Sequence, residues 1–121
     1  MKFQLSFNLK SCVLPIDYRR CILSFIKHCL SNANGGKYFA DFYGPAKEKA
    51  FCFSTIFDQP NYTSDHIEVT SPKMSMVFST PDTRTGFILY SAFAAQKGKS
   101  YPLPLENRMT LTQITQLKED V

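Results

Sequence analysis

The 121-residue sequence has no tryptophan, only five glycines, and no apolar run near the roughly 20 residues that a membrane span needs. Its 44% hydrophobic and 20% charged residues exclude a disordered chain, and the scarcity of glycine excludes a collagen-like repeat. Residues 1–10 alternate polar with apolar side chains instead of forming the apolar core of a signal peptide. We therefore expect a cytoplasmic protein with no membrane partner, folded as one domain over residues 1–121.

The sequence also lacks paired cysteines. Cys12, Cys21, Cys29 and Cys52 stand 9, 8 and 23 residues apart, which matches neither a CxxC pair nor a zinc-finger spacing. We expect free, buried thiols, no metal site and no cofactor. The 14 basic and 10 acidic residues give a net charge of +4, a mildly basic balance that is compatible with an anionic partner but does not establish one.

The first two predicted elements have regular apolar patterns. Residues 3–9 alternate with period two, which predicts a half-buried strand with Phe3, Leu5, Phe7 and Leu9 on one face. Asp17 is a good N-cap for a helix that ends before Asn34-Gly35-Gly36. The apolar stripe of this amphipathic helix consists of Tyr18, Ile22, Phe25, Ile26, Cys29 and Leu30.

The middle of the chain is less regular. Residues 36–49 predict a short helix or an irregular loop. A second strand follows with Phe51, Phe53, Thr55 and Phe57 on one face, and then a turn-rich connection over residues 58–65. Residues 66–70 and 73–79 predict further strand with Ile67, Val69, Met74, Met76 and Phe78 inward, interrupted at Ser71-Pro72 because proline cannot donate to a ladder.

Thr80-Pro81-Asp82 predicts the start of a second helix that ends at Gly98. We expect one face of it to consist of Phe87, Ile88, Tyr90, Ser91, Ala94 and Ala95. Residues 108–117 predict a final strand, in which the apolar parity slips between Leu111 and Ile114 and indicates a β-bulge. The order βαββαβ is that of an α+β, ferredoxin-like fold with two helices on one face of an antiparallel sheet. This architecture hosts RNA binders, metabolite sensors and enzymes, so it does not decide function.

Arg19 and Arg20 lie in the first turn of the first helix, where the helix dipole disfavours cations by roughly 0.3–1 kcal/mol each. Lys27 extends the same basic face as Arg20. The three side chains could contact phosphates, or they could be solvated residues that Asp17 partly compensates.

His28, beside Lys27 on this helix, is the histidine best placed for acid–base chemistry, although an isolated helical histidine often has only a structural role. His66, at the start of a strand, has a weaker claim. The local sequence assembles no Ser-His-Asp arrangement, carboxylate pair, phosphate-binding glycine loop or metal cluster.

Lys47 and Lys49 lie among aromatic residues, with Tyr38, Phe39, Phe42 and Tyr43 before them and Phe51 and Phe53 after them. Basic residues interleaved with aromatics can hold phosphates and stack exposed bases. The same pattern arises from a strand whose aromatics enter the core, which is the interpretation we favour for Phe51 and Phe53.

Several segments together suggest a family: Phe3-Gln4-Leu5-Ser6-Phe7, Leu14-Pro15-Ile16-Asp17-Tyr18 leading into Leu23-Ser24-Phe25-Ile26, and Lys49-Ala50-Phe51-Cys52-Phe53-Ser54. They resemble the N-terminal domain of the CRISPR-associated endoribonucleases that cut repeat RNA, members of the repeat-associated mysterious protein (RAMP) superfamily of ferredoxin-like folds. The later segments, Ile67-Glu68-Val69-Thr70, Met76-Val77-Phe78-Ser79-Thr80 and Thr112-Gln113-Ile114, are similar in order and spacing.

The resemblance implies a metal-independent cut, in which a general base activates the 2′-hydroxyl beside the scissile phosphate and leaves a 2′,3′-cyclic phosphate and a 5′-hydroxyl. Histidine, tyrosine and lysine commonly serve in that family. Lys49 matches the family lysine in type, whereas Lys27 occupies the tyrosine position and the segment of Asp41, Phe42 and Tyr43 occupies the histidine position. His28 and Tyr43 are the substitutes that this chain offers, and whether the chain is itself an enzyme stays open.

Family members usually continue into a second ferredoxin-like domain with a glycine-rich loop, so the resemblance implies a second domain or other CRISPR-associated proteins as partners. Our first hypothesis is an RNA-binding domain that holds CRISPR repeat RNA with Arg19, Arg20, Lys27, Lys47 and Lys49. The alternative is a non-catalytic interaction module, including a homodimer, that uses its sheet edge or its aromatics. A sensor of small ligands is a third class that no residue cluster supports.

Overall fold

The structure, a computed structural model, describes residues 1–32 and 51–117. In chain order its elements are β1 (Lys2–Leu9), β2 (Val13–Pro15), α1 (Tyr18–Asn32), β3 (Cys52–Phe57), β4 (Asn61–Tyr62), β5 (His66–Glu68), β6 (Lys73–Ser79), α3 (Thr83–Ala94), β7 (Ser100–Leu103) and β8 (Asn107–Leu117). Without the short strands β2, β4, β5 and β7, the order is the predicted βαββαβ. The expectation for residues 36–49 lies outside the described residues.

The main sheet has five antiparallel strands in the order β3-β6-β1-β8-β7. Alternation along each strand decides which side chains face inward: Phe3 pairs with Phe78 and Phe7 with Met74, and all four are buried. Phe53 and Phe51 pack half-buried against this core, as the sequence predicts.

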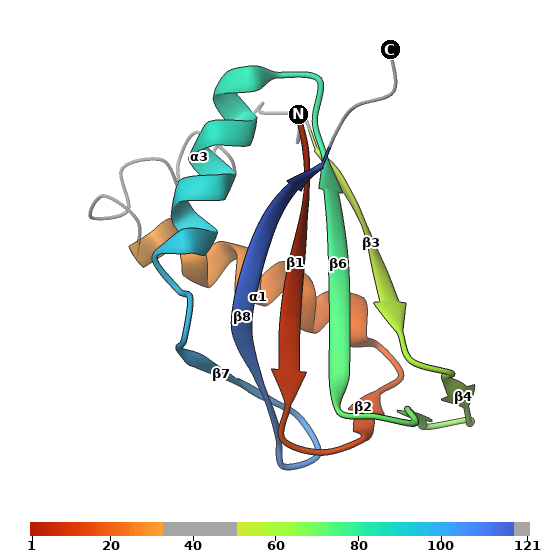
Figure 1. The fold of residues 1–121 in the computed structure, drawn as a ribbon. Helices are drawn as coiled ribbons and strands as arrows, with labels where there is room; N and C mark the ends of the chain where they lie inside the picture. Colours follow the sequence, from red (N-terminus) through yellow and green to blue (C-terminus); the bar gives the residue numbers. More distant parts are fainter. Residues whose placement is uncertain (33–50, 118–121) are drawn as a thin grey trace.

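Both helices cover the same face of the main sheet (Figure 1). Phe25 of α1 meets Phe7 edge to face with ring centroids 5.5 Å apart, and Phe93 of α3 lies 6.1 Å from Phe3. Phe25 and Phe93 also stack on each other at 6.0 Å, which joins the two helices. Two helices on one face of an antiparallel sheet are therefore confirmed.

The buried face of α3 differs from the predicted one. Asp82 caps the helix as expected, since its Oδ1 accepts a hydrogen bond from Arg84 N at 3.2 Å. The residues that face the core are Thr85, Gly86, Leu89, Ala92 and Phe93. The predicted Phe87 is 60% exposed, and the helix ends at Ala94, before Gly98. The packing at Gly86 explains why another face of the helix is buried. A Cβ at this position would lie 2.9 Å from Met1 Cβ, so only a glycine lets this side of α3 pack closely against Met1.

The predicted strand segments around Ser71-Pro72 enter different sheets. β5 pairs with β2 and β4 in a separate three-stranded sheet, whereas β6 pairs with β1 and β3. Part of the connection predicted over residues 58–65 is the short strand β4. Backbone pairing continues by one residue beyond each ladder: Leu9 N donates to Pro72 O at 2.7 Å beside the β1–β6 ladder, and Val69 N donates to Cys12 O at 2.9 Å beside the β2–β5 ladder.

The predicted bulge in the last strand is confirmed. Ser6 pairs with Gln113 but Phe7 with Leu111, so Thr112 is the extra residue. Asn107, at the start of β8, is 2% exposed and holds the β1–β2 connection: its Oδ1 accepts from Ser11 N at 2.9 Å and its Nδ2 donates to Val13 O at 2.7 Å. This anchor places the connection that leads into α1.

All four cysteines are free thiols, but the expectation that they are buried holds only for Cys29. Cys12 and Cys21 are half-buried, and Cys52 is exposed because it occupies an outward position of β3. Neither helix in the described part of the chain is long and apolar enough to cross a membrane.

Candidate functional site

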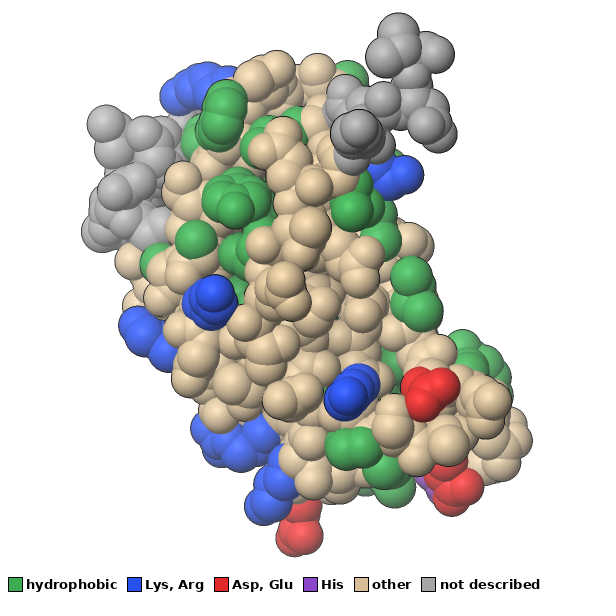
Figure 2. All heavy atoms as spheres, viewed as in Figure 1, with side chains coloured by type: hydrophobic (Ala, Val, Ile, Leu, Met, Phe, Trp, Pro, Cys, Tyr) green, Lys and Arg blue, Asp and Glu red, His purple; other side chains and the backbone are tan. Residues whose placement is uncertain are grey.

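The outer face of the main sheet, opposite the helices, has only uncharged and basic side chains, because none of the five strands contains aspartate or glutamate. Its cations are Lys2, Lys73 and Arg108, which stand among serine, threonine, asparagine and glutamine residues. Figure 2 shows this face as mostly tan, with separate blue side chains. The face therefore presents mainly uncharged hydrogen-bonding groups with three separate cations, and its apolar side chains include Ile56 and Val77.

Three acidic residues lie together at another part of the surface. Asp58, Asp65 and Glu68 flank β4 and β5, and Figure 2 shows acidic side chains at this lower right corner. α1 contains no acidic residue and carries Arg19, Arg20 and Lys27, whereas Arg84 of α3 stands two residues after the N-cap Asp82. Among the described residues, α1 is therefore the helix with the larger excess of basic side chains, with Asp17 directly before its first residue.

The predicted phosphate contacts of α1 do not all lie in the same environment. The Arg19 guanidinium lies over the Phe53 ring, 4.8 Å from its centroid, so this side chain anchors α1 to β3 by a cation–π contact while staying exposed. Arg20 and Lys27 are exposed on the outer face of the helix. The structure thus gives Arg19 a packing role, and it leaves Arg20 and Lys27 at the surface.

His28 is exposed and meets a residue that sequence reasoning did not single out. The ring of Tyr101 in β7 lies 5.2 Å from the His28 ring, and the Tyr101 hydroxyl and Ser24 Oγ are 2.8 Å apart. Tyr101 also packs edge to face on Phe25 at 5.3 Å. No local signal could have found this cluster, because 77 residues separate Ser24 from Tyr101.

The other predicted site residues cannot be joined to this cluster. Tyr43, Lys47 and Lys49 lie outside the described residues, and so does their spacing from His28. In the part of the chain that the structure describes, no three His, Cys, Asp or Glu side chains are placed to hold a metal ion.

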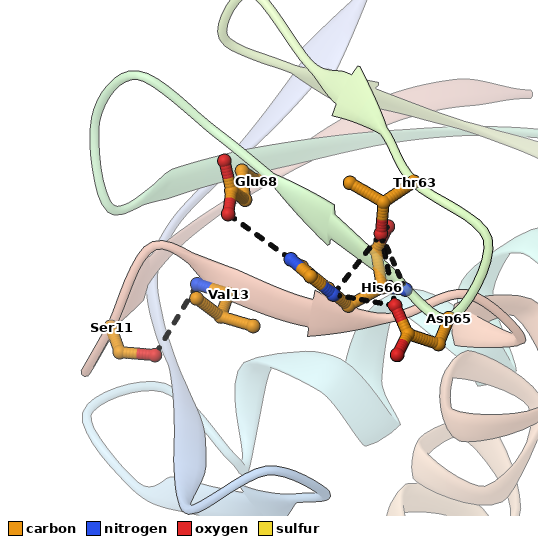
Figure 3. A network of polar contacts seen from close by, with 6 residues as sticks. All are labelled: Ser11, Val13, Thr63, Asp65, His66 and Glu68. Atoms are coloured by element: carbon orange, nitrogen blue, oxygen red, sulfur yellow. Dashed lines mark hydrogen bonds and ion pairs between the residues drawn. The ribbon is translucent and has the colours of Figure 1, made fainter.

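His66 takes part in a separate polar network on the small sheet (Figure 3). Its Nδ1 lies 2.9 Å from Asp65 Oδ1 and its Nε2 lies 3.1 Å from Glu68 Oε1, while Thr63 Oγ1 accepts from His66 N at 3.1 Å. The hydrogen bonds to Glu68 and Asp65 raise the pKa of His66, and the bond to His66 lowers the pKa of Asp65. Both imidazole nitrogens are engaged, so this network stabilises the β4–β5 turn.

No family model and no curated protein sequence matches the chain. Solved structures do. A RAMP protein that binds different RNA substrates superposes with a TM-score of 0.81 at 15% identity, over 100% of this chain and 50% of that one. A Cas6-related protein from Pyrococcus furiosus also reaches 0.81 at 13% identity, over 100% and 49%. The CRISPR-associated protein Cas6 reaches 0.72 at 17% identity, over 99% and 49%.

The chain therefore has the fold that about half of each of these proteins adopts. At these identities the likeness is one of fold. The resemblance to the CRISPR-associated endoribonucleases that the sequence segments suggest is confirmed at that level.

Proposed function

We propose that this chain is a ferredoxin-like RNA-binding domain of a CRISPR-associated protein that processes repeat RNA in the cytoplasm. The strand order β3-β6-β1-β8 around the βαββαβ chain supports the ferredoxin-like assignment, with β7 as an added edge strand. The similar structures support the CRISPR-associated family.

The observation that carries RNA binding is the excess of basic over acidic side chains on α1. An anionic backbone is attracted to a surface where cations outnumber carboxylates, and it is repelled by the corner of Asp58, Asp65 and Glu68. The acid-free sequence of α1 presents Arg20 and Lys27 at the surface. We propose these two residues, with Arg19, Lys47 and Lys49, as contacts to RNA phosphates.

Cleavage is the finer part of the proposal. A base on this chain, with His28, Tyr43 and Lys49 as the candidates, takes the proton from a ribose 2′-hydroxyl. The 2′-oxygen then attacks the adjacent phosphorus, and the bond to the 5′-oxygen of the next nucleotide breaks. That oxygen gains a proton, so the products are a 2′,3′-cyclic phosphate and a 5′-hydroxyl. A second domain, another CRISPR-associated protein or a second copy of the chain would complete the RNA site.

The test is incubation of the purified chain with labelled CRISPR-repeat RNA in excess EDTA, read for gel shift and for cleavage. Electrostatic binding should weaken with salt at a log–log slope of about −0.7 for each phosphate neutralised on a single strand. Arg20→Ala should reduce the steepness by about one such increment. Arg84→Ala in α3 is the matched control, because it also removes one exposed helical arginine.

A salt-independent affinity would contradict the proposal, and so would Arg20→Ala and Lys49→Ala proteins that bind repeat RNA as well as the parent. A cyclic-phosphate product that His28→Ala abolishes would assign the base to His28. Binding without cleavage would leave the chain as the RNA-holding part of a larger enzyme.

The second candidate function is that of a protein-interaction module, and the observation that favours it is the position of β3 at the edge of the main sheet. Among the described strands β3 pairs only with β6, and its outward Ile56 is 55% exposed. An open edge of this kind can add a strand from another chain. Size-exclusion chromatography with light scattering tests it, since a strict monomer that binds RNA argues for the first candidate.

A further inference from the structure

We propose that Ser24, His28 and Tyr101 form a binding site for a backbone phosphate of single-stranded RNA at the junction of α1 and β7. This inference rests on the proposed function. It adds uncharged hydrogen-bond donors to the phosphate contacts that we propose for the lysine and arginine side chains. It starts from the three side chains that the fold brings together from two elements distant in the sequence.

The Tyr101 ring is held independently of its hydroxyl. Phe25 supports the ring edge to face at 5.3 Å, and the His28 ring lies against it at 5.2 Å with the planes tilted by 48°. The hydroxyl reaches the surface, where it meets Ser24 Oγ at 2.8 Å. An exposed hydrogen bond of this kind adds little to stability, because water would replace it at small cost. The hydroxyl is therefore accessible to a group outside the chain.

The polar groups of the junction are mainly donors. Each hydroxyl carries one proton, so the Ser24–Tyr101 bond uses one of the two and leaves the other able to donate to a ligand. Asn32 Nδ2 lies 3.4 Å from His28 Nδ1 and donates to His28 O at 2.8 Å. Because Asn32 Nδ2 can only donate, this contact favours the tautomer whose proton is on Nε2. A His28 that holds a phosphate in this state leaves the role of base to Tyr43 or Lys49. A hydroxyl and an imidazole N–H that both donate match the oxygens of a phosphate.

The surrounding charge favours an anion. Arg20 lies one helical turn before Ser24, and Lys27 is adjacent to His28. Lys99, which directly precedes β7, is exposed. Neither α1 nor β7 contains a carboxylate that could occupy the donors. A phosphate has a higher charge density than a neutral ribose or base, so it gains most in this field.

The test compares Tyr101→Phe with the parent in a fluorescence titration of labelled single-stranded repeat RNA over a salt series. Tyr101→Phe removes one hydroxyl and keeps the ring on Phe25. We expect about tenfold to hundredfold weaker binding, the effect of one lost hydrogen bond to a charged group. Because no charge is removed, the slope against salt should stay that of the parent.

Matched controls separate this site from general effects. Tyr62→Phe removes an exposed tyrosine hydroxyl from β4, and it should bind RNA as the parent does. Ser24→Ala should reproduce most of the loss, whereas Ser91→Ala on the exposed side of α3 should not. The double variant Tyr101→Phe/Ser24→Ala should lose less than the product of the single losses, because both contact one phosphate.

Several results would overturn the site. A parent that binds RNA, with Tyr101→Phe and Ser24→Ala binding equally tightly, refutes this inference and leaves the proposed function standing. A parent that binds no RNA refutes both. Polyglutamate that binds with the same Tyr101→Phe penalty refutes the assignment to phosphate, and a Tyr101→Phe protein whose loss follows a lower unfolding midpoint refutes a direct contact.

Discussion

Asn107 offers the sharpest test of how the helix side of the molecule is positioned. Its buried amide makes hydrogen bonds on both sides: Oδ1 accepts from Ser11 N at 2.9 Å and Arg108 N at 2.8 Å, and Nδ2 donates to Ser11 O at 3.2 Å and Val13 O at 2.7 Å. These bonds tie the β1–β2 connection to the start of β8. The connection leads through β2 into α1, which carries the proposed RNA contacts.

Asn107→Ala leaves two backbone N–H groups and two carbonyls without these partners. Each buried group left unsatisfied costs about 1–3 kcal/mol, but Ser11 and Val13 are half-buried and water can reach part of the gap, so we expect a total near 3 kcal/mol. A chain of this length has an unfolding entropy of about 0.25 kcal/mol per kelvin, so the midpoint should fall by about 12 °C.

Asn107→Asp separates donors from acceptors. The carboxylate keeps the two acceptor roles but loses both N–H groups and faces the carbonyl oxygens of Ser11 and Val13. This setting raises the carboxyl pKa in the folded protein, so the loss of stability should be large at pH 7 and should shrink as the pH falls through the folded-state pKa. The protonated acid regains one donor.

The assay is thermal and urea unfolding, followed by circular dichroism, of the parent, both variants and Asn8→Ala, which removes an exposed amide of the outer sheet face. The control should change stability by less than about 0.5 kcal/mol. The reasoning is refuted if Asn107→Ala unfolds within about 3 °C of the parent, or if Asn107→Asp loses the same stability at pH 4 as at pH 7.

Three further expectations follow from the described residues. Glu106 has a φ of 59° in the β7–β8 turn, so Glu106→Gly should raise the unfolding free energy by about 0.5–1 kcal/mol in urea titrations, and a loss would contradict the strain. The pKa of His66 is raised and the pKa of Asp65 is lowered in the folded protein. The difference in unfolding free energy between the parent and His66→Gln should therefore be greatest between pH 3.8 and pH 6.5, the ordinary pKa values of Asp65 and His66. It should be lost as the pH rises through the folded pKa of His66, or falls through that of Asp65, and a pH-independent difference would contradict the network. A thiol reagent should modify exposed Cys52 first and Cys29 only on unfolding, because burial raises the pKa of Cys29 to about 12, and early labelling of Cys29 by mass spectrometry would contradict its burial.

Short-range patterns were sufficient for the elements that bury one regular face. The alternation from Phe3 to Leu9 and the apolar stripe from Ile22 to Leu30 correctly predicted the buried sides of β1 and α1. The parity slip before Ile114 correctly predicted the bulge in β8. In each case the period of the apolar residues follows from backbone geometry alone.

The second helix shows where such patterns fail. α3 carries apolar residues on several sides, so its sequence fits more than one buried face. The close approach of Met1 to Gly86 selects one of them and leaves Phe87 exposed. The assignment of residues 66–68 and 73–79 to different sheets has a similar cause, because both segments alternate and only pairing with β2 or β1 distinguishes them.

The candidate site also combines features that the sequence predicts with features that only the tertiary structure shows. The sequence by itself determined the basic, acid-free composition of α1 and the exposure of Arg20, Lys27 and His28, because the apolar stripe of a helix dictates its opposite face. Only the tertiary structure placed Arg19 on Phe53 and brought Tyr101 to Ser24 and His28. Periodicity records how one segment meets the core, whereas contacts between segments 77 residues apart depend on strand order and packing that no local pattern contains.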